Sequence, residues 1–210
     1  MDESGRIGVD ESGKGDYFGP LVIAACYVGP EHEAELEGVC DSKKLSDAQA
    51  LRLSGVIREV CPHAVVAVGP EKYNQLYAKI GNLNRLLEWG HAQAIQNCRE
   101  NVDCRRVISD RFANPQGLER TLKAKGIDVD LTSMVRAESD LAVAAASILA
   151  RAEFLRRLER LGGEIGTPLP KGAGAPVLAA ARRLAPKLGR EGMAKIAKMH
   201  FRTTGQAFGG

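Results

Sequence analysis

The sequence has 210 residues, of which 44% are hydrophobic, which is enough for a buried core and too many for a disordered chain. The length suits one compact domain, and no apolar run reaches the roughly 18 residues of a membrane-spanning helix. The net charge of +3 excludes a chain that is strongly acidic or basic as a whole.

The charge is nevertheless distributed unevenly. Residues 171–202 contain eight basic residues and one acidic residue, so this segment carries +7 and the remainder of the chain −4. A basic C-terminal surface fits contact with a polyanion on one side of the protein, although a solvated helical face explains the segment equally simply when it is taken alone.

In chain order, the patterns predict two strands, a helix, a strand, a helix, two strands and a long helix. These elements cover residues 4–11, 20–28, 46–60, 64–68, 83–99, 105–109, 127–135 and 139–161. Ser46 is the expected N-cap of the first helix. This order predicts an α/β fold with a mixed five-stranded sheet flanked by helices.

The composition changes after Leu161. Residues 162–174 are rich in Gly and Pro and predict a loop, and helical pieces are expected around 176–188 and 191–199. We therefore expect a catalytic core over 1–161 and a loop with a basic C-terminal helical extension over 162–210, both within one compact unit.

Two adjacent carboxylates, Asp10 and Glu11, stand where the first apolar strand gives way to the glycine-rich segment Gly13-Lys14-Gly15. Carboxylates at the end of a buried strand are costly unless something positive compensates them, and a divalent cation is the usual compensation. The glycines allow backbone N–H groups to approach a phosphate or a sugar closely. The pattern indicates metal-assisted chemistry on a nucleic-acid backbone.

Two further acids, Asp110 and Glu138, follow the fourth strand and precede the long helix. Asp10 and Asp110 would meet if the first and fourth strands were neighbours, and Glu138 would be stabilised at a helix N-terminus. Four such acids could hold two divalent cations about 3.5–4 Å apart for phosphoryl displacement. Taken singly, Asp110 also fits a turn, and Glu138 fits any helix start.

A nucleotide-binding loop is the competing interpretation of the same segment. Residues 8–15 nearly match G-x-x-x-x-G-K-[ST], but Gly15 replaces the Mg²⁺-binding hydroxyl. The match also places Asp10 and Glu11 where the loop should accept phosphates, which disfavours an ATP or GTP hydrolase.

Six segments, in order along nearly the whole chain, resemble the motifs of type 2 ribonucleases H. They are residues 8–21 (Gly-Val-Asp-Glu-Ser-Gly-Lys-Gly-Asp-Tyr-Phe-Gly-Pro-Leu), 41–45, 108–113, 136–151, and the C-terminal pieces 169–173 and 200–204. The ribonuclease HII branch carries Gly-Arg-Gly where this chain has Gly13-Lys14-Gly15. That difference, and Glu rather than Asp at position 138, favour the ribonuclease HIII branch.

The resemblance implies an RNase H-like fold and endonucleolytic cleavage of the RNA strand of RNA–DNA hybrids, giving 5′-phosphate and 3′-hydroxyl ends. It implies a two-metal site for Mg²⁺ or Mn²⁺ held by four catalytic acids: Asp10, Glu11, Asp110 and Glu138. It also implies substrate contacts by Gly13, Lys14 and Gly15 with ribose 2′-hydroxyls and by Ser42 and Lys43 with a phosphate. Without the resemblance, Ser42 and Lys43 would be interpreted as part of an exposed segment that leads into a helix.

Two other functions are carried as alternatives. One is cleavage at single ribonucleotides embedded in duplex DNA, as in ribonuclease HII, although the Gly-Lys-Gly version favours a run of ribonucleotides. The other is a hybrid-binding module without catalysis, which the presence of all four acids disfavours.

The resemblance also implies a separate N-terminal substrate-binding domain, which we expect this chain to lack because only the first few residues precede the first strand. We hypothesise that the basic segment 171–202 compensates in part. Five cysteines without a C-x-x-C pair favour free thiols, and the four histidines have no zinc-ligand spacing to them. With no signal peptide, these features predict a cytoplasmic monomer with no membrane and no obligatory protein partner.

Overall fold

The structure is a computed structural model that describes residues 5–40, 42–110, 115–135 and 137–209, with only the backbone of Pro115 and Glu138. The chain forms two compact units. The first contains residues 1–11, 23–66 and 82–152, and the second contains residues 12–22, 67–81 and 153–210. The predicted division of the chain at residue 161 remains a prediction.

Five strands form one sheet in the order β3-β2-β1-β4-β5. They are β1 (Arg6–Ser12), β2 (Leu21–Val28), β3 (His63–Val68), β4 (Arg106–Asp110) and β5 (Asp130–Met134). The strand β4 pairs in parallel with β1 on one side and with β5 on the other. The carboxyl ends of these three strands therefore lie along one edge, and the predicted mixed five-stranded sheet is confirmed.

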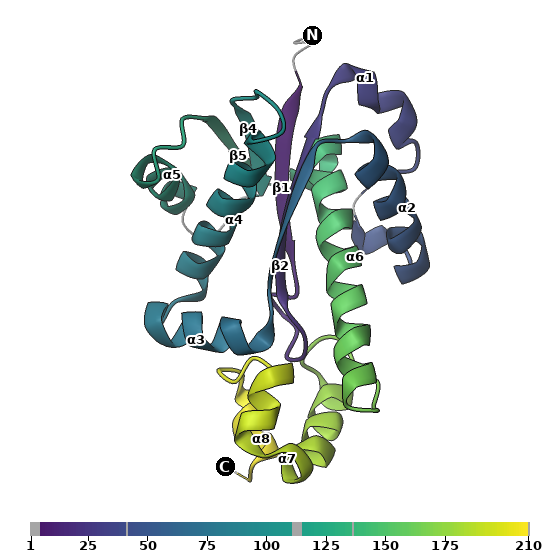
Figure 1. Ribbon diagram of the computed structural model, residues 1–210, viewed down its shortest axis with the longest axis vertical. Coiled ribbons are helices and arrows are strands. Elements are labelled where there is room, and N and C mark those ends of the chain that lie inside the picture. The colour runs from purple at the N-terminus through teal and green to yellow at the C-terminus, as the bar shows by residue number, and fades with distance from the viewer. Residues whose placement is uncertain (1–4, 41, 111–114, 136, 210) are drawn as a thin grey trace. The chain divides into compact units, whose positions relative to one another are not determined.

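Helices of the first unit cover both faces of the sheet (Figure 1). The helices α2 (Asp47–Val60) and α6 (Leu141–Glu164) lie on one side, and α4 (Leu83–Arg99) and α5 (Pro115–Ala124) lie on the other. Seven of the eight residues of β2 are buried, as expected of a strand covered on both faces. In the described part of the chain, no helix has the length and apolar character that crossing a bilayer requires.

The helices α2 and α6 each have their start fixed by a side chain. Ser46 Oγ accepts a hydrogen bond from the backbone N–H of Gln49, whose side chain accepts one from Ser46 N, so the predicted cap of α2 is confirmed. Asp140 Oδ1 accepts a hydrogen bond from Ala142 N at the start of α6, and its Oδ2 accepts one from Arg6 Nε at 2.6 Å. Because Asp140 caps the helix, α6 begins at Leu141 rather than at the predicted residue 139.

Gly8 brings β1 and α6 into backbone contact. A Cβ built at Gly8 would lie 2.1 Å from the carbonyl carbon of Ala142 and 2.2 Å from Val143 N. Only glycine fits this approach, so the strand that carries Asp10 packs directly on the first turn of α6.

The second unit is helical, with α3 (Pro70–Ile80), α7 (Ala175–Ile196) and α8 (Arg202–Ala207). A left-handed Gly189 (φ 64°) interrupts α7, which confirms the two helical pieces expected here. Asn74 of α3 ties the C-terminal segment to this unit. Its Nδ2 donates to the carbonyls of Ala194 and Ala197, and its Oδ1 accepts from Met199 N.

Several short helices escaped the sequence patterns, namely α1 (Pro30–Glu33), α3, α5 and α8. The pair Gly69-Pro70 reads as a turn, but Pro70 occupies the first position of α3, where its missing N–H costs nothing. The strand β5 begins at Asp130 rather than at 127, because Ile127 N bonds to Leu122 O and completes the end of α5.

Candidate active site

The register of the two central parallel strands brings two predicted acids together. Gly8 lies opposite Ile108 and Val9 opposite Ser109, so the next step along each strand leads to Asp10 and Asp110. Both carboxylates therefore stand at the carboxyl ends of neighbouring strands, and both residues are partly buried. The first and fourth strands are neighbours, which is the condition under which Asp10 and Asp110 were expected to meet.

The Asp10 carboxylate is hydrogen-bonded to the side chain of Ser147 on α6. Burial and the adjacent negative charge of Glu11 raise the pKa of Asp10 to about 6, against the lowering effect of the Ser147 hydrogen bond. Two crowded carboxylates at a strand end form an anionic position that a cation would stabilise.

The second carboxylate, Glu11, lies against a buried histidine. His91 Nε2 of α4 is 3.0 Å from Glu11 Oε2, and the side chains of the two residues are 0% and 13% exposed. Ser147 of α6 thus contacts Asp10, and His91 of α4 contacts Glu11, so the two carboxylates are held by helices on different faces of the sheet.

Ser42 is linked to Asp10 through one hydroxyl. Ser42 Oγ lies 2.7 Å from Ser147 Oγ, which also bonds to the Asp10 carboxylate. Arg151 holds the same turn, with its guanidinium donating to Ser42 O and to Asp47 Oδ1. Ser42 is buried at 5% exposure, whereas Lys43 beside it is exposed, so of the two predicted phosphate contacts Lys43 is the accessible one.

The fourth predicted acid, Glu138, belongs to the short helix η3 (Ala137–Ser139), and its side chain lies outside the described residues. Its neighbour Ala137 is fully buried against Ile108 of β4 and Val143 of α6. This packing holds the backbone of Glu138 beside the strand that ends in Asp110. Within the described residues, no three Asp, Glu, His or Cys side chains form a metal-binding group.

The predicted substrate loop belongs to the second unit. Gly13 has φ +86°, and a Cβ there would lie 2.2 Å from Pro20 O, so this position requires glycine. Lys14 and Gly15 are exposed, and no described heavy atom lies within 4 Å of a Cβ built on Gly15. The conformation of the loop therefore requires glycine at position 13, whereas in the absence of substrate a larger side chain at position 15 would meet no described atom.

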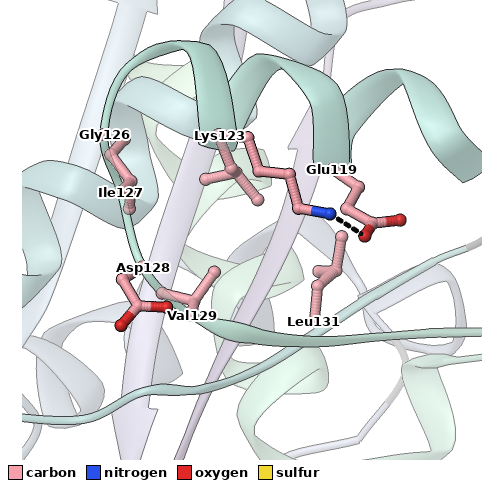
Figure 2. A pocket seen from close by; sticks show the side chains of 8 residues that line it. Glu119, Lys123, Gly126, Ile127, Asp128, Val129 and Leu131 are labelled. Atoms are coloured by element: carbon pink, nitrogen blue, oxygen red, sulfur yellow. Dashed lines mark hydrogen bonds and ion pairs between the residues drawn. The ribbon is translucent and has the colours of Figure 1, made fainter.

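A separate pocket of about 370 Å³ lies in the first unit between α5 and β5 (Figure 2). Leu122, Ile127 and Leu131 contribute apolar surface, and Lys123 Nζ donates to Glu119 Oε1 at 2.8 Å. None of the predicted site residues lines this pocket, so it is distinct from the candidate active site.

Sequence reasoning missed the two helix residues that contact the acids. His91 and Ser147 lie on buried helix faces, where a lone His or Ser reads as a core residue. The available signal is that both are polar positions within otherwise apolar stripes of α4 and α6, and buried polar side chains need partners.

The comparisons with known proteins agree over nearly the full chain. A family model described as ribonuclease HII matches residues 7–204. The ribonuclease HIII of Protochlamydia amoebophila is 45% identical over 205 residues, covering 97% of this chain and 68% of that protein. That of Chlamydia pneumoniae is 46% identical over 206 residues, covering 94% of this chain and 68% of the relative.

Solved structures show the same similarity. Bst-RNase HIII in complex with Mn²⁺ superposes with a TM-score of 0.91 at 34% identity, covering 99% of this chain and 70% of that chain. Ribonuclease H2 from Pyrococcus horikoshii, at 22% identity and a TM-score of 0.81, covers 97% of this chain and 96% of its own, and supports the RNase H-like fold alone. Together these matches show that the chain is a ribonuclease H of the type 2 family and belongs to its ribonuclease HIII branch.

Proposed function

We propose that this protein is an endonuclease that cleaves the RNA strand of RNA–DNA hybrids and leaves 5′-phosphate and 3′-hydroxyl ends. The observation that carries the proposal is the register of β1 and β4, which leads to Asp10 and Asp110 at adjacent strand ends. In a chain of the ribonuclease HIII branch, this pair is the expected centre of the hydrolytic site.

The residues present suit a divalent metal. Asp10, Glu11 and Asp110 offer carboxylate oxygens, the ligands that Mg²⁺ and Mn²⁺ prefer, and Mg²⁺ binds through few carboxylates and several waters. The pKa of Asp10 is raised by burial and, after that, by the negative charge of Glu11, and a cation would offset both effects. The solved relative Bst-RNase HIII binds Mn²⁺. When bound, two cations would supply an activated water and stabilise the leaving 3′-oxygen.

Within this proposal, Asp10 and Asp110 are the central ligands, and Glu11 and Glu138 complete the ligand shells or orient water. The side chains around them have positioning roles. Ser147 holds the Asp10 carboxylate by a hydrogen bond, and His91 holds Glu11 from the opposite face of β1. Such outer partners fix the orientation of carboxylate ligands.

Recognition of the substrate is assigned to two segments. The exposed tip Lys14-Gly15 with Gly13 contacts the ribose 2′-hydroxyls, which distinguish RNA from DNA. The exposed Lys43 binds a backbone phosphate as a point charge. The buried Ser42 has a supporting role, because its hydrogen bond to Ser147 holds the turn that carries Lys43.

The test uses two labelled duplexes of the same sequence, incubated with the protein and Mg²⁺ or Mn²⁺. One is an RNA–DNA hybrid, and the other is DNA with a single embedded ribonucleotide. Extension of the cleaved fragments by a DNA polymerase, without prior treatment, reports a 3′-hydroxyl end. EDTA is the control for the metal requirement.

Metal-dependent cleavage of the hybrid, with extendable fragments, is the expected result. Cleavage only at the embedded ribonucleotide would replace the proposal with a ribonuclease HII-like specificity. Binding of the hybrid without any cleavage would overturn the catalytic assignment and favour a hybrid-binding module.

A further inference from the structure

A buried lysine lies under the loop to which we assign ribose contact. Lys198 follows α7 in the second unit, and none of its surface is exposed. Its Nζ donates to Asp16 O at 2.8 Å and to Gly19 O at 2.7 Å. These two carbonyls belong to the segment that immediately follows Gly13-Lys14-Gly15, so one side chain bridges both ends of residues 16–19.

The chemistry of the amine matches its surroundings. Burial lowers the pKa of Lys198 to about 7, and a neutral amine has two N–H bonds for the two carbonyls that accept them. The ring of Tyr73 lies on another side, with its centroid 5.6 Å from Nζ. A buried lysine is rare without such partners, and here both partners are backbone atoms of the loop base.

Backbone hydrogen bonds from the same C-terminal segment also hold residues 16–19, and together with the Lys198 amine they form what we call the clamp. Lys198 N donates to Tyr17 O at 2.8 Å, and Gly19 N donates to Ile196 O at 2.9 Å. The segment around Gly172 adds two more bonds. Tyr17 N donates to Gly172 O at 2.9 Å, and Gly172 N donates to Asp16 Oδ1 at 2.5 Å.

The clamp separates a fixed base from an exposed tip. Tyr17, Phe18 and Gly19 are buried, whereas Lys14 and Gly15 are exposed. Asp16 N donates to Gly13 O at 3.3 Å, so the exposed tip closes as a turn on the clamped residue. The position of the tip therefore depends on contacts made to residues 16–19, and no interaction with a ligand is needed to set it.

We propose that Lys198 is a positioning residue for recognition of the RNA strand: it fixes the base of the Gly13-Lys14-Gly15 loop so that the tip meets a ribose 2′-hydroxyl in a preformed geometry. This inference rests on the proposed function. It assigns Lys198 no contact with substrate, so the residue acts through the loop. Removing the Lys198 amine should therefore change the selectivity for ribose more than the rate of hydrolysis.

The experiment compares Lys198→Met, which keeps most of the length of the unbranched side chain and removes both donors, with the wild type. Lys79→Met is the matched control, because it makes the same substitution at an exposed position of α3 in the same unit, outside the basic segment 171–202. Cleavage of the RNA–DNA hybrid gives kcat and KM. A DNA duplex of the same sequence, used as a competitor, gives an inhibition constant. The ratio of this constant to the KM for the hybrid is the ribose selectivity.

We expect Lys198→Met to lower this selectivity by about 10-fold, through a higher KM for the hybrid, because a displaced loop loses hydrogen bonds to the ribose. The kcat and the inhibition by DNA should stay within about 2-fold of the wild type, as should the selectivity of Lys79→Met. General loss of folding would instead lower kcat and leave the ratio unchanged, so the ratio separates positioning from structural damage.

Asp16→Ala provides a second route should Lys198→Met fail to fold. It removes the bond from Gly172 N at the same loop base and leaves the amine in place. The same loss of selectivity is expected. A folded Lys198→Met or Asp16→Ala protein with wild-type selectivity would overturn the inference. Absence of hybrid cleavage by the wild type would overturn the proposed function instead, so the two failures are distinguishable.

Discussion

His91 Nε2 lies 3.0 Å from Glu11 Oε2, with the histidine ring fully buried beneath the strand that also carries Asp10. The contact links α4 to the proposed metal site from the face opposite Ser147. Because a carboxylate that is already hydrogen-bonded is held in one orientation, this histidine should matter for metal binding although it is not a proposed ligand.

Replacing His91 with leucine should raise the Mn²⁺ concentration needed for half-maximal cleavage by about 10-fold, within the range for loss of an outer-shell partner. His91→Gln is the matched control, because its amide can still donate toward Glu11 and should retain most of the metal affinity. A metal titration of hybrid cleavage measures both variants, with thermal unfolding recorded in parallel. Equal metal requirements for the two variants would show that the contact only fills the core.

Asp10→Asn should lower hybrid cleavage by at least about 100-fold, the upper end of what loss of an outer-shell partner costs. Hybrid binding should persist, since the loop and the basic surfaces are unchanged. The melting temperature in EDTA should not fall, because the substitution removes the repulsion between Asp10 and Glu11. Cleavage rates and melting curves measure these effects, and near wild-type turnover would contradict the assignment.

Gly15→Ala tests the exposed tip of the substrate loop. A Cβ has open space there, so the free energy of unfolding should change by no more than about 0.5 kcal/mol. The KM for the hybrid should nevertheless rise by about 10-fold, because the methyl group would block close approach of a ribose. Gly163→Ala in α6, which is equally unobstructed, is the control and should stabilise the fold without changing KM. An unchanged KM for Gly15→Ala would remove Gly15 from the substrate contacts.

The buried Lys198 predicts a rise in stability with pH. The pKa of its amine is about 7 in the folded chain against an ordinary value of 10.5, so between these pH values the unfolded chain holds a proton that the folded chain lacks. The free energy of unfolding should therefore increase with pH above about 7, by at most about 1.4 kcal/mol per pH unit from this group. Below pH 7 both states are protonated, and the contribution of this group is constant.

Urea unfolding at pH 7, 8 and 9 measures this slope, and Lys198→Met should flatten it relative to the wild type. Asp16 and His200 interact electrostatically with the amine, so the comparison between the two proteins is made with both residues unchanged. Above pH 9 the rise is opposed in both proteins, because burial raises the pKa of Cys98 to about 12 and its thiol ionises more readily in the unfolded chain. Parallel slopes for the two proteins between pH 7 and 9 would mean that Lys198 is protonated in the fold.

The basic helix α7 should contribute to nucleic-acid affinity. Arg182, Arg183 and Lys187 are exposed on it, and replacing all three with Gln should flatten the slope of log affinity against log salt by about 0.9 for each phosphate that the variant no longer neutralises. The matched control replaces three exposed cations of the first unit, Arg120, Lys123 and Lys125. Hybrid binding between low and moderate salt measures the slopes. An unchanged slope for the α7 variant would leave this helix as a solvated surface.

The sequence was sufficient to predict where most strands and long helices lie along the chain. Apolar runs located β1 and β2, Ser46 located the start of α2, and the stripe of α4 was found with its observed ends. The short helices α3 and α5 were missed, since each begins at a proline that punctuates loops as often as helices. The pairing of β1 with β4 depends on long-range order that no local pattern contains.

The candidate site divides in the same way. Asp10, Glu11 and Asp110 were found because carboxylates at strand ends are costly and conspicuous. His91, Ser147 and Lys198 were not proposed as site residues, because the reason for each polar group lies in a residue at least 80 positions away in the chain. Only the folded structure shows that these three side chains end on the first strand or on the loop that follows it.

The backbone contact at Gly8 limits where the Asp10 carboxylate, the proposed centre of the site, can be. Because strand and helix touch there without an intervening side chain, neither can slide or tilt alone without a main-chain collision two residues from Asp10. Thermal displacement of that carboxylate is thus coupled to the movement of a 24-residue helix, which is heavy and slow on the scale of a side chain. Within the proposed function, folding therefore supplies part of the preorganisation that catalysis at this carboxylate requires.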